Sequence, residues 1–184
     1  QLPALRDGTR RPETEVAQGS LTKPRAGPML LPAARNASDT PARIGRRMSY
    51  PSVRKVVMLN GDGRIWTAEQ AMPEPRDGQL VVQVAASLVS PGTELGGVRA
   101  RRENPTGRTE GRPFGYTNSG VVVATQGDCG EFSVGDRVAG MGGGYALHAT
   151  HACIPHNLCA LVPDGVAFEH AASSHLAATA LHAV

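Results

Sequence analysis

The stretch that decides the fold runs from residue 120 to residue 139 and reads GVVVATQGDCGEFSVGDRVA. It begins with a valine-rich run over 120–125, continues through glycines and aspartates, and ends with a second short run over 137–139. Valine favours extended backbone, whereas Gly and Asp favour turns. The stretch therefore predicts two short strands joined by a turn-rich connection.

The same succession of strands and turns continues on both sides. Over 79–88, Leu80, Val82, Val84 and Ala86 fall on one face of an alternating pattern, which predicts a strand. Further strands are predicted at 55–59, 64–67, 145–149 and 158–162, with a loop over 90–118 and one helix at 168–184. We therefore expect a mainly β fold, a small barrel or sandwich with a C-terminal helix. Strands without intervening helices exclude a parallel doubly wound sheet.

Composition divides the chain into two parts. Residues 1–47 hold nine Lys/Arg against four Asp/Glu, whereas residues 48–184 hold ten against twelve. The first part is rich in proline and lacks hydrophobic periodicity, so a disordered basic tail is predicted over 1–47 and one domain over 48–184. Whether the tail is native or an upstream read-through stays open, because Met48 directly precedes the ordered pattern. The near-neutral domain makes nucleic acid an unexpected partner.

The composition indicates the kind of hydrophobic core, and the cysteines indicate the cellular compartment. Only 4% of the residues are aromatic, so the core is expected to be aliphatic. Cys129, Cys153 and Cys159 form no C-x-x-C pair, and no secretory signal precedes them. Reduced thiols and a cytoplasmic protein are expected. No apolar run reaches the roughly 20 residues that a membrane-spanning helix needs, so no membrane partner is expected.

Several short motifs follow one another in the order and spacing of a single family. They are SPGTE at 90–94, GYTNSGVV at 115–122, FSVGDRV at 132–138, GGYA at 143–146 and NL with LVPDGV at 157–166. Over residues 54–184 the chain resembles the N-terminal GroES-like domain of the medium-chain dehydrogenase/reductase superfamily, which includes the zinc-type alcohol dehydrogenases. The resemblance implies a partly open β-barrel. It also implies an NAD(P)-dependent oxidoreductase that moves hydride to or from a carbonyl, alcohol or activated alkene.

The positions of the family's zinc ligands and their neighbours are altered here. They correspond to Pro91, Tyr116, Thr117 and His175. Proline has no donor atom, Tyr and Thr are poor zinc ligands at neutral pH, and one imidazole does not hold zinc. We therefore expect no catalytic zinc.

A second group of metal-binding residue types is dense in sequence. His148, His151 and His156 lie close in sequence to Cys153 and Cys159. Strand and turn geometry need not bring these side chains together, so ordinary surface or core histidines are expected.

Without zinc, other groups must polarise the substrate. The resemblance places Tyr116 in the cleft as a proton donor, Thr93 at the hydroxyl of the proton relay and His175 in the same region, so these three are the candidate catalytic residues. It places Thr179 beside the nicotinamide, as the candidate cofactor-binding residue. The alternative interpretations are that Tyr116 is an aromatic residue packed in the core, that the Thr93 hydroxyl stabilises a turn, and that His175 is a helix residue packed against the barrel.

The arginines of the 99–112 segment offer a further candidate. In the family this region borders the substrate cleft, so Arg99 and Arg112 are candidate substrate-binding residues for an anionic group. A solvated basic loop is the alternative interpretation.

No G-x-G-x-x-G turn between a strand and a helix occurs in this sequence. The resemblance therefore implies a missing Rossmann domain as partner, which would bind most of NAD or NADP, and a homo-oligomer is compatible with the family. This chain alone is expected to be inactive. The alternative function is a stand-alone GroES-like protein-binding module or an inactive fragment.

Overall fold

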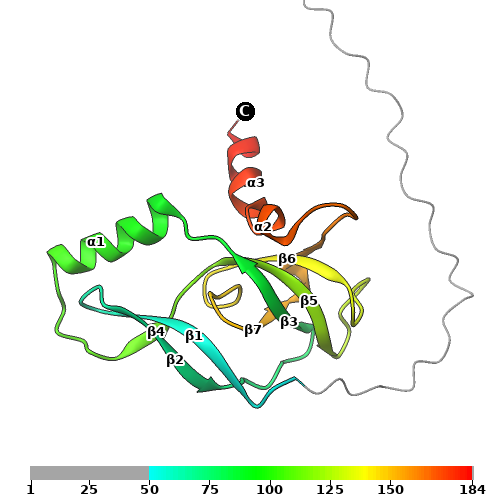
Figure 1. Ribbon diagram of the computed structural model, residues 1–184, viewed down its shortest axis with the longest axis horizontal. Coiled ribbons are helices and arrows are strands. Elements are labelled where there is room, and N and C mark those ends of the chain that lie inside the picture. Colours follow the sequence, from blue (N-terminus) through cyan, green and yellow to red (C-terminus); the bar gives the residue numbers. More distant parts are fainter. Residues whose placement is uncertain (1–49, 184) are drawn as a thin grey trace, which may run out of the picture. The chain divides into compact units, whose positions relative to one another are not determined.

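The computed structural model describes residues 50–183, so the tail predicted over 1–47 lies outside the described residues. The described part is mainly strands in two sheets, which confirms the predicted mainly β fold (Figure 1). One sheet has the strand order β2-β1-β4 and the other β7-β3-β5-β6-β8.

The three-stranded sheet is built on a hairpin. Its strands are β1 (Val53–Asn60), β2 (Ile65–Ala71) and β4 (Gly111–Pro113), and both neighbours run antiparallel to β1. The Asn60 side-chain oxygen accepts hydrogen bonds from the backbone N–H groups of Asp62, at 3.1 Å, and Arg64, at 2.9 Å. This closes the Asn-Gly turn that the sequence predicts.

The five-stranded sheet has β5 (Thr117–Gln126) at its centre. Its neighbours are β3 (Gln79–Ser87) and β6 (Arg137–Met141), and the edges are β7 (His151–Pro155) and β8 (Cys159–Leu161). Gly120 of β5 lies so close to β3 that a Cβ at this position would overlap the Gln83 carbonyl oxygen.

The core is aliphatic, as the composition predicts. Fully buried side chains from the larger sheet include Leu80, Val82, Val122, Val138 and Ile154. The smaller sheet covers a second cluster, formed by Val56, Met58 and Leu147.

The segment at 148–150 joins the two sheets. The Val57 N–H donates to the His148 carbonyl at 2.8 Å, and the Thr150 N–H donates to the Lys55 carbonyl at 2.9 Å. These bonds continue the smaller sheet into the chain that enters β7 and so link the two sheets.

The prediction of a loop over 90–118 was wrong in part. This segment contains a π-helical turn, η1 (Pro91–Leu95), an α-helix, α1 (Gly96–Glu103), and the short strand β4. Ser90 caps η1 and Pro91 stands in its first turn, where a missing N–H costs nothing. In α1 only Val98 is buried, so the apolar periodicity that would reveal a helix is absent.

The strand predicted at 145–149 is wrong as well. The Gly142 carbonyl accepts hydrogen bonds from the N–H groups of Tyr145 and Ala146, at 3.1 and 3.0 Å, which closes a turn. The strand begins later, as β7, where no strand was predicted. Of the strand predicted at 158–162, β8 covers the middle, after a 3-10 turn, η2 (His156–Leu158).

The helix predicted at 168–184 is broken into α2 (Phe168–Ala171) and α3 (Ser174–His182). Two hydroxyls of β5 donate to carbonyls at the two ends of α2: Ser119 Oγ to Phe168 O at 2.6 Å, and Thr117 Oγ1 to Ala172 O, next to the break, at 2.7 Å. These bonds hold α2 against the larger sheet (Figure 1). Within residues 50–183, no helix has the length and apolar character that crossing a membrane requires.

Candidate functional site

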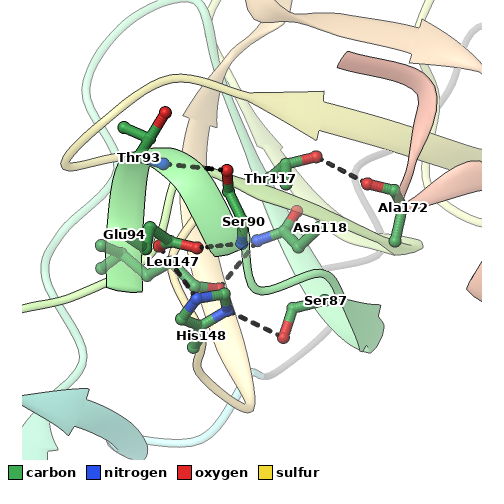
Figure 2. Close-up of polar contacts among 9 residues, drawn as sticks. All are labelled: Ser87, Ser90, Thr93, Glu94, Thr117, Asn118, Leu147, His148 and Ala172. Carbon is green, nitrogen blue, oxygen red and sulfur yellow. Dashed lines mark hydrogen bonds and ion pairs between the residues drawn. The ribbon is translucent and has the colours of Figure 1, made fainter. Parts of the chain in front are cut away.

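The η1 turn directs two neighbouring side chains in opposite directions. The Thr93 N–H donates to Ser90 Oγ at 3.4 Å, which closes the turn. Thr93 is exposed, whereas Glu94 is 4% exposed and points into the protein (Figure 2). Glu94 Oε2 accepts the backbone N–H of Ser90 at 2.8 Å. The carboxylate thus caps the turn that presents Thr93 to the surface.

The other Glu94 oxygen meets His148. His148 Nε2 lies 3.1 Å from Glu94 Oε1, and His148 Nδ1 lies 3.0 Å from Ser87 Oγ (Figure 2). His148 is 7% exposed, so the pair is closed off from water. Because a carboxylate only accepts, Nε2 carries the hydrogen that faces Glu94. In the neutral ring, Nδ1 then accepts a hydrogen bond from the Ser87 hydroxyl.

His148 also contacts the segment that carries Tyr116. Its N–H donates to the Phe114 carbonyl at 2.9 Å, and the two rings meet edge to face with centroids 5.5 Å apart. Gly115 has φ of +124°, and a Cβ there would overlap the backbone of Leu147 and His148. Only glycine allows this approach. His148 is therefore a common contact of the Thr93 turn and the Tyr116 segment.

A buried amide fixes the residue before His148. Asn118 is fully buried on β5, and its Nδ2 donates to the Leu147 carbonyl at 3.0 Å. The loop that carries His148 is thus tied to the centre of the larger sheet.

The structure brings together two of the three predicted catalytic residues. The rings of Tyr116, which directly precedes β5, and His175, on α3, meet edge to face with centroids 5.3 Å apart. Both side chains are half-buried. In the described part of the chain, no hydrogen bond joins the Thr93 hydroxyl to either ring, so Thr93 is not shown to belong to the same cluster.

Thr179 lies one turn beyond His175 on α3. Its Oγ1 donates to the His175 carbonyl at 3.0 Å, and the residue is exposed. The bond leaves the lone pairs of this hydroxyl free to accept.

The two predicted arginines lie in different surroundings. Arg99 on α1 forms an ion pair with Glu103, with Nε and Oε1 2.7 Å apart, and its side chain is 80% exposed. Arg112 on β4 pairs in register with Leu59 and lines two surface hollows. Arg99 does not line either of the two hollows that Arg112 lines.

The residues at the family's zinc positions do not fit a zinc ion. Pro91 has no donor, and the Thr117 hydroxyl already donates to Ala172. No group of three His, Cys, Asp or Glu side chains that could hold a metal occurs among residues 50–183. Burial raises the pKa of Cys159 to about 12 and also raises those of Cys129 and Cys153. Burial thus disfavours the thiolate form, which is the form that binds zinc.

Glu94 and His148 are the residues that sequence reasoning missed. A signal for Glu94 existed, because Ser90 followed by Pro91 is typical of a helix start, where an acidic residue nearby is favourable. Nothing local marks His148, whose carboxylate partner lies 54 residues away in sequence.

No family profile and no curated protein matches this chain. Solved structures do match. A mycobacterial quinone oxidoreductase is 28% identical and covers 70% of this chain with a TM-score of 0.54. The human synaptic vesicle membrane protein VAT-1 homolog-like protein is 26% identical and covers 66%, with a TM-score of 0.53. A mycobacterial protein solved in complex with NADPH is 28% identical and covers 65%, with a TM-score of 0.50.

The match involves only part of each solved structure. This chain covers 40%, 39% and 36% of these three chains, respectively. The structures confirm the resemblance to the medium-chain dehydrogenase/reductase superfamily and the GroES-like fold of the described residues.

Proposed function

We propose that this chain is the substrate-side domain of an NAD(P)-dependent oxidoreductase that works without catalytic zinc. The observation that carries the proposal is the contact of Tyr116 with His175 at positions where zinc enzymes of the family have ligands. The oxidoreductase neighbour and the NADPH complex support the reaction class and the cofactor. The substrate class that follows is a carbonyl, an alcohol or an activated alkene.

Tyr116 supplies the acid in this proposal. When bound, the nicotinamide donates or takes up hydride, and the substrate oxygen gains or loses charge accordingly. A phenol can donate a hydrogen bond or a proton to such a developing oxyanion. The edge-to-face contact with His175 restricts the orientation of the Tyr116 ring, which would hold the phenol in place before substrate arrives.

The buried Glu94–His148 pair positions the remaining groups. It fixes η1, so the exposed Thr93 hydroxyl is held at the surface, where we propose that it relays a proton. Thr179, with lone pairs free to accept, is proposed to lie beside the nicotinamide.

The wider assignment follows the same proposal. We assign residues 48–184 to this domain and a Rossmann domain as its partner, which would contribute most of the NAD(P) site. We also assign the protein to a reducing, cytoplasmic setting, in which the three free cysteines of the described residues would remain thiols.

The test uses the full-length protein that contains this chain. NADPH oxidation is measured with a panel of quinones and aldehydes, and bound metal is measured by mass spectrometry. We expect Tyr116→Phe to lower kcat/KM by about 10²–10⁴-fold, the usual contribution of a general acid.

Tyr145→Phe is the matched control, because Tyr145 is 40% exposed and its side chain forms no hydrogen bond with residues 50–183. Its activity should equal that of the unmodified protein. Stoichiometric zinc with loss of activity on chelation, or full activity of Tyr116→Phe, would contradict the proposal.

A further inference from the structure

Two adjoining surface hollows meet at Arg112. One, of about 770 Å³, is lined by residues of α1, β4 and the loop at 106–110. The other, of about 510 Å³, is lined by β1, β4 and the glycines at 143–144. Arg112 and Leu59 line both, so the two hollows are neighbours, and we refer to them together as the arginine hollow.

The lining of the arginine hollow is strongly basic. Its charged members are Arg54, Arg101, Arg108, Arg112 and a single acid, Glu110. Within residues 50–183, none of these arginines forms an ion pair with a carboxylate. Among residues 50–183, Arg99 is the arginine that does form such a pair, with Glu103.

The burial of Arg54 makes the excess of positive charge in the hollow energetically unfavourable. It is only 7% exposed, and Nη1 donates to the His151 carbonyl at 3.3 Å. Its Nε is buried without a hydrogen-bond partner among the described residues. Burial lowers the pKa of Arg54, because removal from water disfavours the charged guanidinium. A buried charge normally has a partner of opposite sign, and an anion in the hollow would provide it.

The backbone around the hollow is held in place. Gly107 N–H donates to Asp62 Oδ1 at 2.8 Å, and the Gly61 N–H donates to the Arg108 carbonyl at 3.1 Å. Arg101 Nη1 donates to the Gly97 carbonyl at 2.8 Å, which fixes its guanidinium beside α1. The loop is thus anchored to the β1–β2 turn, and the arginines are presented from fixed points.

We propose that the arginine hollow binds a small molecule with two oxyanion groups, either carboxylates or phosphates. Guanidinium groups match both, because their parallel N–H donors fit two oxygens of one anion. Identification of this dianion as the substrate rests on the proposed function. Binding itself does not, because it requires no nicotinamide.

The single tryptophan provides the assay. Trp66 lies against Gly111, which lines the hollow. The 184-residue chain is titrated with succinate and with pyrophosphate at constant ionic strength, and Trp66 fluorescence is followed. We expect saturable binding of at least one probe, and the stronger probe identifies a carboxylate or a phosphate ligand.

Substitutions localise the binding. Arg112→Gln should raise the Kd about tenfold, since it removes a charge-assisted hydrogen bond to the anion. Arg76→Gln removes the same charge from an exposed position outside the hollow and should leave the Kd unchanged. Circular dichroism confirms that both variants are folded.

Three results would overturn the proposal: a response that does not saturate, an equal response to sodium chloride, or equal weakening by Arg112→Gln and Arg76→Gln. Each would show that only general charge attraction is present. The activity test of Tyr116 is independent of these titrations, so failure of one proposal is distinguishable from failure of the other.

Discussion

Glu94→Ala removes the buried carboxylate that joins η1 to His148. The Ser90 N–H and the His148 Nε2–H then lose their acceptor, at 2.8 and 3.1 Å, and water has no access to replace it. Each buried donor left without an acceptor costs about 1–3 kcal/mol, so the loss of both bonds should cost several kcal/mol. His148→Ala should cost a similar amount, because it leaves the Glu94 carboxylate buried with one donor. Against a total stability of about 5–15 kcal/mol, either loss is large.

The double variant separates this pair from general packing. With both groups removed, neither leaves the other unpaired, so the double variant should be less destabilised than the two single variants together. We expect a coupling energy of about 2 kcal/mol, within the range for contacting residues. The free energy of unfolding is measured by urea titration of the 184-residue chain, followed by circular dichroism.

The exposed pair Arg99–Glu103 is the matched control. Its donor and acceptor are 2.7 Å apart, but the side chains are 80% and 57% exposed. Its coupling energy should be only about 0.3–0.5 kcal/mol, as in other helix surface pairs. If Glu94→Ala does not fold, Glu94→Gln replaces it and should cost about 1 kcal/mol, because the amide keeps one acceptor.

A coupling energy for Glu94 and His148 no larger than that of the exposed control would refute the reasoning. It would mean that the two side chains are not energetically joined, in spite of their distance and burial. The proposal that this pair fixes the position of Thr93 would then also be rejected.

Two further predictions concern β5 and β7. Gly120→Ala should destabilise the protein by at least about 3 kcal/mol in the same urea titration, because its Cβ overlaps the backbone of β3. Gly143→Ala has open space around the new Cβ and should change stability little; equal effects would contradict the packing argument. Burial lowers the pKa of His151 below 6.5, so the folded state binds fewer protons than the unfolded state. Stability from this residue is therefore present above pH 6.5 and decreases as the pH falls. His151→Gln should flatten that decrease between pH 7 and pH 5, relative to the unchanged chain; an identical pH profile would show that His151 is not responsible.

Local patterns were enough for part of the fold. The strand over 79–88 and the Asn-Gly turn after Asn60 depend on neighbours two to four residues away, and both are present. The aliphatic core follows from the low aromatic content alone. The motifs between 90 and 166 identified the fold, because their spacing reflects the whole domain rather than any one element.

Other features escaped the same reasoning. Helix α1 buries one residue, Val98, so it lacks an apolar stripe to predict it. The segment at 145–149 has the composition of a strand, but the Gly142 carbonyl closes it into a turn.

The sequence by itself determined the alternation of strands and turns, the fold family and the chemical identity of the groups at the altered zinc positions. Only the tertiary structure decided which groups meet: Tyr116 with His175, and Glu94 with His148. The physical reason is that these contacts join residues 54 or more positions apart, so chain closure and strand register create them. Local propensity acts over a few residues and contains no information about such pairs.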